Sequence, residues 1–135
     1  MPYPVEHIEG IGRGYGAKLR EAGISTTADL LRAAGSRQRR RELARRTGIE
    51  EGRLAKWVAM ADFMRIKGVG SQYAELLEAI GLRTVRQLRG ERVETLESRM
   101  MEVNGEGRVT RSLPARKTIA RWIAQAKSLP PAVSS

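Results

Sequence analysis

The sequence predicts an all-α protein built from two tandem helical units packed around a shared core. Three observations lead to this prediction: residues 8–30 recur as residues 66–88, apolar side chains recur at helical spacing, and no segment alternates convincingly like a strand. We expect a first unit over 1–64, a second over 65–129 and a disordered tail over 130–135. Two isolated units of this size would each be marginally stable, so a joint core is expected.

The internal repeat is the strongest of these signals. A second block, LAKWVAMA at 54–61, matches IARWIAQA at 119–126 and places Trp57 over Trp122. Its offset of 65 exceeds the offset of 58 in the first block, so the second unit holds an insertion, which we place near 103–111. The residues identical in the first block are Ile8/Ile66, Gly10/Gly68, Gly12/Gly70, Tyr15/Tyr73, Leu19/Leu77, Gly23/Gly81, Thr26/Thr84 and Leu30/Leu88.

Each unit is expected to begin with two helices joined by a Gly-hydrophobic-Gly turn. The segment PVEHI supplies the first helix of one pair, and the end of a helix over 51–65 supplies that of the other. Glycine accepts backbone angles that a Cβ forbids, which permits a tight reversal. Ile11 and Val69, between the glycines, are expected to plug into the helix pair. This arrangement is a helix-hairpin-helix motif.

The later elements follow from local signals. Gly23 and Gly81 stand where a helix C-terminus favours a left-handed residue, and Thr26 and Thr84 stand at capping-box spacing before short helices. Those helices end near Gly35 and Gly90. Further helices are expected over 37–46 and 92–102, and the longest helices over 51–65 and 115–128. The dipeptide NG at 104–105 is a candidate for a small hairpin turn.

Composition points to a polyanionic partner. The formal charge is +10 and the pI is about 11.0, and both units carry a share of the excess positive charge. An arginine bias from genomic base composition is the alternative explanation. No apolar run reaches the ~18 residues of a membrane span, and there is no cysteine. The first residues, MPYPVEHIEG, lack the basic segment and apolar stretch of a signal peptide. These features favour a cytoplasmic protein.

The segments IEGIGRGYGAKLREAGI and IKGVGSQYAELLEAIGL resemble the helix-hairpin-helix superfamily. TGIEEGRLAKWVAMA resembles a second, degenerate hairpin of the same unit. The closest likeness is to a bacterial domain-of-unknown-function family of paired hairpins, over residues 4–128. IGLRTVRQL also resembles the C-terminal domain of the RNA polymerase alpha subunit.

The resemblance implies sequence-nonspecific binding to the DNA backbone. Backbone N–H groups of the turns, at the start of the following helix, would donate to phosphates, as helix N-termini do in general. The implied contacts in the first hairpin are Gly10, Ile11 and Gly12, assisted by Arg13 and Lys18. Those in the second are Gly68, Val69 and Gly70, assisted by Lys67, Ser71 and Gln72.

Two positions depart from the superfamily pattern. DNA-binding members usually carry proline before the first glycine, where this chain has Glu9 and Lys67. Glu9 would repel a phosphate and Lys67 would attract one. The second hairpin is therefore the better candidate for a phosphate site, and the first is either a weaker site or only a joint between helices.

A basic helix is the other candidate contact. Residues 37–46 contain six arginines, and Arg37, Arg41 and Arg45 align on one helical face while Leu43 turns inward. Such a ridge could follow a phosphate backbone, or it could be a solvated face. Trp57 and Trp122 are expected in the core and not as platforms for bases.

Enzymatic functions find little support. His7 is the only histidine, and no cluster has metal-ligand spacing. The four glycines of 8–16 fail the dinucleotide spacing, and GYGAKL fails the phosphate-loop pattern. We expect a non-catalytic module that binds double-stranded DNA. It is expected to need no cofactor, to contact no membrane and to have no small-molecule substrate. The alternative is a protein-interaction or scaffold module in which the hairpins only connect helices. RNA is a third possible partner, but no feature of the sequence distinguishes it from DNA.

Overall fold

The computed structural model describes residues 2–107 and 109–134, and these residues form one 3₁₀-helix, eight α-helices and no named strand. The prediction of an all-α fold is confirmed. In chain order the elements are η1 (Val5–His7), α1 (Gly12–Glu21), α2 (Thr27–Ala34), α3 (Arg37–Thr47), α4 (Glu51–Phe63), α5 (Ser71–Ala79), α6 (Val85–Leu88), α7 (Val93–Glu106) and α8 (Arg116–Ser128).

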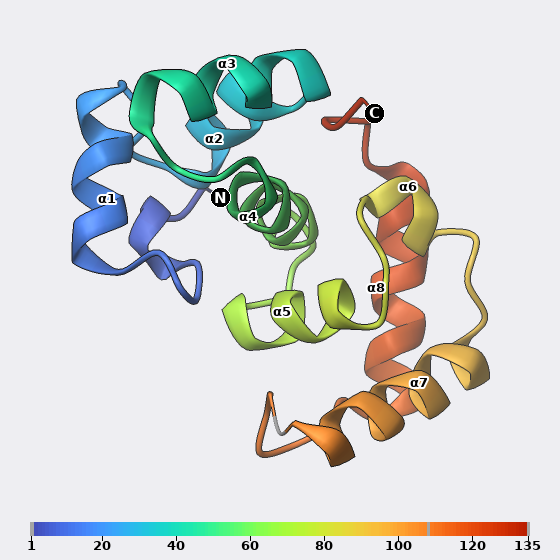
Figure 1. Cartoon of the computed structure of the whole chain (residues 1–135). Helices are drawn as coiled ribbons and strands as arrows, with labels where there is room; N and C mark the ends of the chain where they lie inside the picture. The colour runs from blue at the N-terminus through green and yellow to red at the C-terminus, as the bar shows by residue number, and fades with distance from the viewer. Residues whose placement is uncertain (1, 108, 135) are drawn as a thin grey trace.

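Helix α4 lies between the two halves of the molecule (Figure 1). It packs against α2 and α3 on one side and against α5 on the other, while α8 packs against α6 and α7. Eight of its 13 residues are buried, including Trp57 and Phe63, because a helix covered on several sides needs apolar side chains around most of its circumference. The buried apolar side chains of both halves form one cluster.

Local signals set several of the helix boundaries. Thr26 and Asp29 form a complete capping box at the start of α2. Thr84 caps α6 by accepting from the N–H of Gln87, but the Gln87 amide oxygen accepts from Arg83 N–H at 2.7 Å instead of closing the box. The predicted left-handed residues are present, with φ of 86° at Gly23 and 102° at Gly81.

The second half departs from the predicted boundaries around its insertion. Helix α7 continues through Glu106 and is the longest helix of the described residues, with 14 residues against 13 in α4 and in α8. Asn104 and Gly105 lie inside its last turn, so the hairpin turn considered there is absent. The Asn104 side chain holds the following loop instead, by accepting from the N–H groups of Val109 and Thr110.

A buried carboxylate joins the two halves. Asp62, near the end of α4, is 1% exposed and accepts from the N–H of Val85 at 2.7 Å and from Arg65 at 2.6 Å. Arg65 also donates to the carbonyl of Pro130. One ion pair thus connects α4 to the start of α6 and to the segment after α8.

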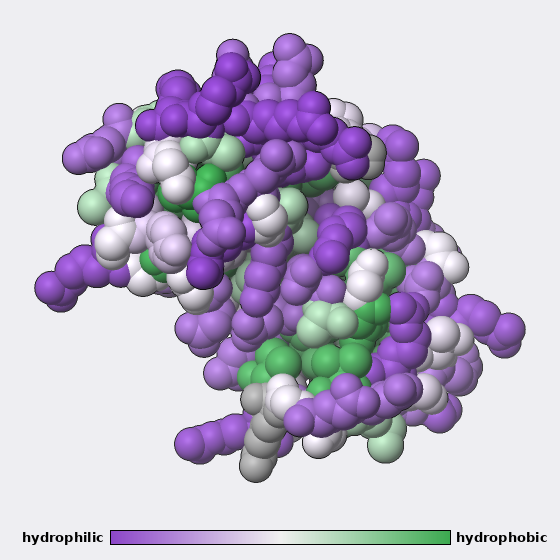
Figure 2. Space-filling model, viewed as in Figure 1, coloured by the Kyte–Doolittle hydropathy of each residue, from purple (hydrophilic) through white to green (hydrophobic). Residues whose placement is uncertain are grey.

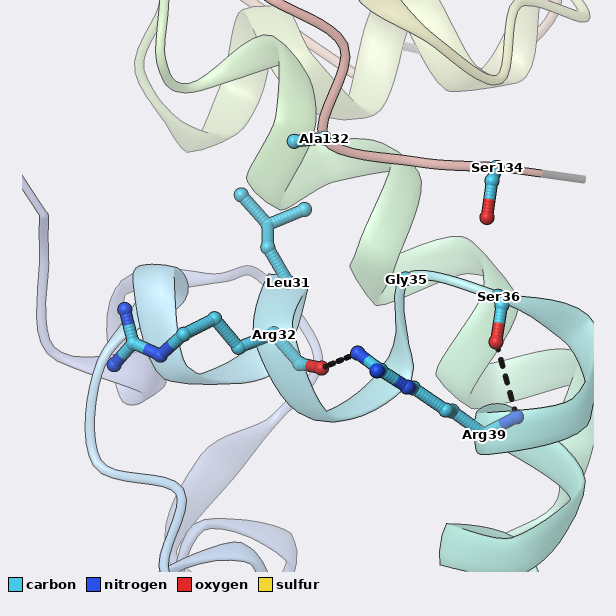
Figure 3. Close-up of a pocket in the computed structure, with 7 residues that line it drawn as sticks. All are labelled: Leu31, Arg32, Gly35, Ser36, Arg39, Ala132 and Ser134. Carbon is cyan, nitrogen blue, oxygen red and sulfur yellow. Dashed lines mark hydrogen bonds between the residues drawn. The ribbon is translucent and has the colours of Figure 1, made fainter.

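Residues 130–134, where the sequence predicts disorder, pass over the first half of the molecule and contact it. Ser134 N–H donates to Gly35 O at 2.8 Å, and Ala132 and Val133 pack on the core. The segment passes so close to Gly35 that a Cβ there would lie 2.8 Å from Ala132 O. It forms one side of a hollow over α2 and the start of α3, lined also by Arg32, Ser36 and Arg39 (Figure 3).

Among residues 2–107 and 109–134, no helix combines the length and the apolar character that crossing a membrane requires.

Candidate nucleic-acid interface

The first hairpin turn is built from two exposed glycines around a buried isoleucine. Gly10 and Gly12 have φ of +96° and +58°, a region that side chains rarely adopt. Ile11 is 1% exposed, and its N–H donates to Ile8 O at 3.2 Å. The turn rests on a tryptophan, because a Cβ at Gly10 would lie 3.7 Å from Trp57 Nε1.

The second turn repeats this construction with one difference. Gly68 has φ of +94°, Val69 is buried and donates its N–H to Ile66 O at 3.1 Å, and a Cβ at Gly68 would lie 3.6 Å from Trp122 Nε1. Gly70, however, has φ of −88° and serves as the extended N-cap of α5. The backbone at the start of α5 therefore has the extended conformation that is usual for an N-cap residue.

The two turns lie next to each other. The N–H of Glu9 in the first turn donates to Ser71 Oγ, at the start of α5, at 2.7 Å. In Figure 1 the turn before α1 approaches the N-terminal end of α5. The structure thus brings together two elements that lie about 60 residues apart in the sequence. It also engages the Ser71 hydroxyl, one of the predicted phosphate ligands, in the contact between the turns.

The start of α5 offers free backbone donors. The first four N–H groups of a helix lack acceptors within it, and no side chain of the described residues caps α5. Lys67, Gly68, Gly70 and Gln72 are all exposed. The backbone of Lys67 is held by Gln125, whose amide accepts from Lys67 N–H at 2.9 Å and donates to Lys67 O at 3.2 Å.

The first hairpin has a different charge environment. Arg13 and Lys18 are exposed on α1. Glu9 is also exposed, beside the glycines, and places a negative charge at the edge that the two turns share. The Glu6 carboxylate, on η1, is paired with Arg20 at 2.6 Å, and that hydrogen-bonded guanidinium lowers the pKa of Glu6 to about 2.

The basic helix α3 lies apart from the turns. It runs along the upper edge of Figure 1, where Figure 2 shows a hydrophilic surface, whereas the turns lie below α4. Arg37, Arg41 and Arg45 are exposed and Leu43 is buried, as predicted. Arg40 instead turns inward and donates to Ala34 O at 3.1 Å, and burial lowers the pKa of its guanidinium.

A further cation approaches the second hairpin from the loop after α7. Gln72, in the first turn of α5, and Arg111 line one shallow depression together with Val109 and Thr110. The sequence locates the insertion but not where it packs, since that depends on tertiary contacts. Arg108, in the same loop, lies outside the described residues.

These features define an all-α protein that presents two neighbouring glycine turns at one edge. The chain belongs to the family described as Domain of unknown function (DUF4332), whose model matches residues 9–129. No curated protein and no solved structure matches the chain.

Proposed function

We propose that this chain is a non-catalytic, cytoplasmic module of the helix-hairpin-helix superfamily that binds the backbone of double-stranded DNA. One observation carries the proposal: the turns of both hairpins lie side by side, linked by the 2.7 Å hydrogen bond from Glu9 N–H to Ser71 Oγ. Each exposes its glycines while burying the hydrophobic residue between them. The internal repeat supports an origin by tandem duplication.

The proposed contacts are electrostatic and independent of base sequence. Unpaired N–H groups at a helix start, together with the helix dipole, favour an anion. Ile11 and Val69 already donate their N–H groups to the carbonyls of Ile8 and Ile66, which follow the preceding helices. The remaining donors at the start of α5 would therefore meet the phosphate. Contacts of this kind position a protein on a duplex without reading its bases.

The second hairpin is proposed as the principal site. It combines the extended N-cap Gly70 with the exposed cation Lys67, whereas the first combines Gly12 in the left-handed region with the anion Glu9. A unit charge at about 4 Å changes an interaction by about 1 kcal/mol in water and by more near a protein surface. In the proposed complex, α3 adds contacts only to a duplex long enough to reach it.

The test is fluorescence anisotropy of a labelled duplex, titrated with the protein at several salt concentrations. We expect log-linear weakening with salt, at about −0.9 per phosphate contacted. The triple variant Lys67→Glu/Gly68→Ala/Gly70→Ala should bind more weakly than wild type, while Glu9→Lys should bind more tightly. Lys127→Glu, an exposed change of equal charge on α8, is the matched control, and circular dichroism checks folding.

If the triple variant and the control bind with equal affinity, the turns do not contact the duplex and only connect helices. Failure of the wild-type protein to bind any duplex would reject the proposal. To test α3, the variant Arg37→Gln/Arg41→Gln/Arg45→Gln should lose affinity for a long duplex and keep its affinity for a short one.

An exposed apolar area favours the second candidate function, binding of a protein partner. Met101 is 57% exposed and Leu113 36%, and both line a depression between α7 and α8. Figure 2 shows apolar surface in the region between α5 and α7. For this function, cross-linking in cells should yield a defined set of protein neighbours that Met101→Glu removes and Lys67→Glu leaves unchanged.

A further inference from the structure

The side chain of Asn104 holds the loop after α7 in a defined conformation. Asn104 Oδ1 accepts from the N–H groups of Val109 and Thr110 at 2.7 and 3.0 Å, and Asn104 Nδ2 donates to Thr110 O at 3.1 Å. Thr110 is 6% exposed, and its hydroxyl donates to Ser112 O at 3.2 Å. Asn104 therefore restrains the residues immediately before Arg111.

A second contact fixes this loop on the second hairpin. Tyr73 Oη, in the first turn of α5, donates to Ser112 O at 3.1 Å. The Tyr73 ring packs on Trp122, with centroids 5.2 Å apart, and Trp122 lies under Gly68. The loop, the start of α5 and the glycine turn thus form one connected structure.

Arg111 stands in this structure without a salt bridge to any residue in the described ranges. It lines a depression with Gln72, Val109 and Thr110. An exposed guanidinium offers a planar fork of donors that matches a phosphate, and the Gln72 amide adds uncharged donors. The depression therefore presents a positive charge and hydrogen-bond donors to solvent.

The first hairpin lacks this arrangement. The extra residues of the insertion occur only in the second half, as the change of offset from 58 to 65 shows. Tyr15, which corresponds to Tyr73, lies instead under the guanidinium of Arg53, 5.3 Å from the ring centroid. The two hairpins therefore differ in two ways. The inserted loop packs on the second hairpin, and the residue before the first glycine is Glu9 in the first hairpin and Lys67 in the second.

We propose that Arg111 is a phosphate-binding residue of the second hairpin, with Gln72 beside it and Asn104 as the residue that positions the loop. This inference rests on the proposed function and extends it. The ligand is a phosphate of the duplex backbone next to the one bound at the start of α5. The insertion then adds a backbone contact that the rest of the repeat does not supply.

The experiment measures duplex affinity and its salt dependence for wild type, Arg111→Gln and Arg86→Gln. Arg86 is exposed on α6, away from the start of α5 (Figure 1), so it controls for the loss of one charge. We expect Arg111→Gln to weaken binding about five- to tenfold and to reduce the salt slope by about 0.9, the value for one phosphate contact. Arg86→Gln should change affinity less than twofold.

Asn104→Ala tests the positioning role. It keeps the arginine but releases the loop, so it should weaken binding by several-fold while circular dichroism shows the helices intact. In the double variant Asn104→Ala/Arg111→Gln the two losses should not add, because both remove the same contact.

The outcomes separate the two proposals. If Lys67→Glu/Gly68→Ala/Gly70→Ala weakens binding but Arg111→Gln matches Arg86→Gln, the role of Arg111 is overturned and the proposed function stands. Additive losses in the double variant overturn the positioning role of Asn104. If wild type binds no duplex, both proposals are overturned.

Discussion

The two hairpins carry the same turn on different supports. In the first, the helix before the turn is the three-residue η1, tied to α1 by the Glu6–Arg20 ion pair. In the second, it is the end of the 13-residue α4, which the core surrounds. Gly16 reflects this difference, because a Cβ there would lie 2.7 Å from Glu6 Oε2, whereas the corresponding Ala74 packs in the core.

This comparison teaches that the same turn geometry can occur twice in one chain in different surroundings. Both turns keep a buried hydrophobic residue and a tryptophan below the first glycine. What differs is the second glycine, the charge before the turn and the loop after α7. In the proposed complex these are the features that would bear on phosphate binding, so the two turns would contribute unequally.

The largest expected effect comes from the tryptophans. Trp57→Ala and Trp122→Ala should each cost about 3–5 kcal/mol of stability, as expected for a large aromatic side chain removed from a core. Each is at most 2% exposed, and each packs on the tyrosine of its own hairpin, at 5.1 and 5.2 Å between centroids. Urea denaturation measures the losses. Strongly unequal values would show that the two tryptophans do not contribute equally, despite their similar burial and ring packing.

Asp62 tests the connection between the halves. Asp62→Ala should cost about 3 kcal/mol, because it leaves Arg65 and the Val85 N–H without their buried acceptor. Denaturant unfolding gives the value, and the exposed pair Glu50–Arg53 supplies the control Glu50→Ala, expected within about 0.5 kcal/mol of wild type. A loss no larger than that of the control would contradict the proposed link.

The second glycines offer a matched pair of substitutions. A Cβ at Gly12 or at Gly70 would meet no atom within 4 Å, so only backbone conformation distinguishes them. Gly12→Ser should destabilise by about 1–2 kcal/mol, the cost of a left-handed L-residue, while Gly70→Ser should be neutral or slightly stabilising, because serine is a favoured N-cap. Thermal unfolding measures both. Equal losses would show that the turns differ less than their φ angles indicate.

The smallest expected effect concerns pH and the first hairpin alone. The pKa of Glu6 is lowered from 4.5 to about 2 by Arg20, so the folded state favours the ionised carboxylate. This contribution to stability is complete above pH 4.5 and is lost as pH falls toward 2.

Glu6→Gln should therefore be less stable than wild type at pH 6, with a difference that shrinks toward pH 2.5. Urea denaturation at several pH values measures it. Glu102→Gln, an exposed change of equal charge on α7, is the control, and the same pH-dependent difference in that variant would contradict the assignment to Glu6.

Local chemistry made much of the fold predictable. The Thr26 capping box, the left-handed glycines and the apolar faces of α4 and α8 act over a few residues, so their spacing specifies them. The candidate turns were also predictable, since a repeated pattern of two glycines around a hydrophobic residue is visible in the sequence. The inward turn of Arg40 was not, because it depends on a carbonyl of the neighbouring helix.

The sequence by itself determined the helices, the two turns and the asymmetry of charge between Glu9 and Lys67. Only the tertiary structure decided that the turns meet through Ser71, that the inserted loop packs beside Gln72 and that the C-terminal segment passes over Gly35. The reason is physical. Helix caps and turns depend on neighbours within a few residues, whereas these contacts join groups tens of residues apart, and packing of the whole core sets their distances.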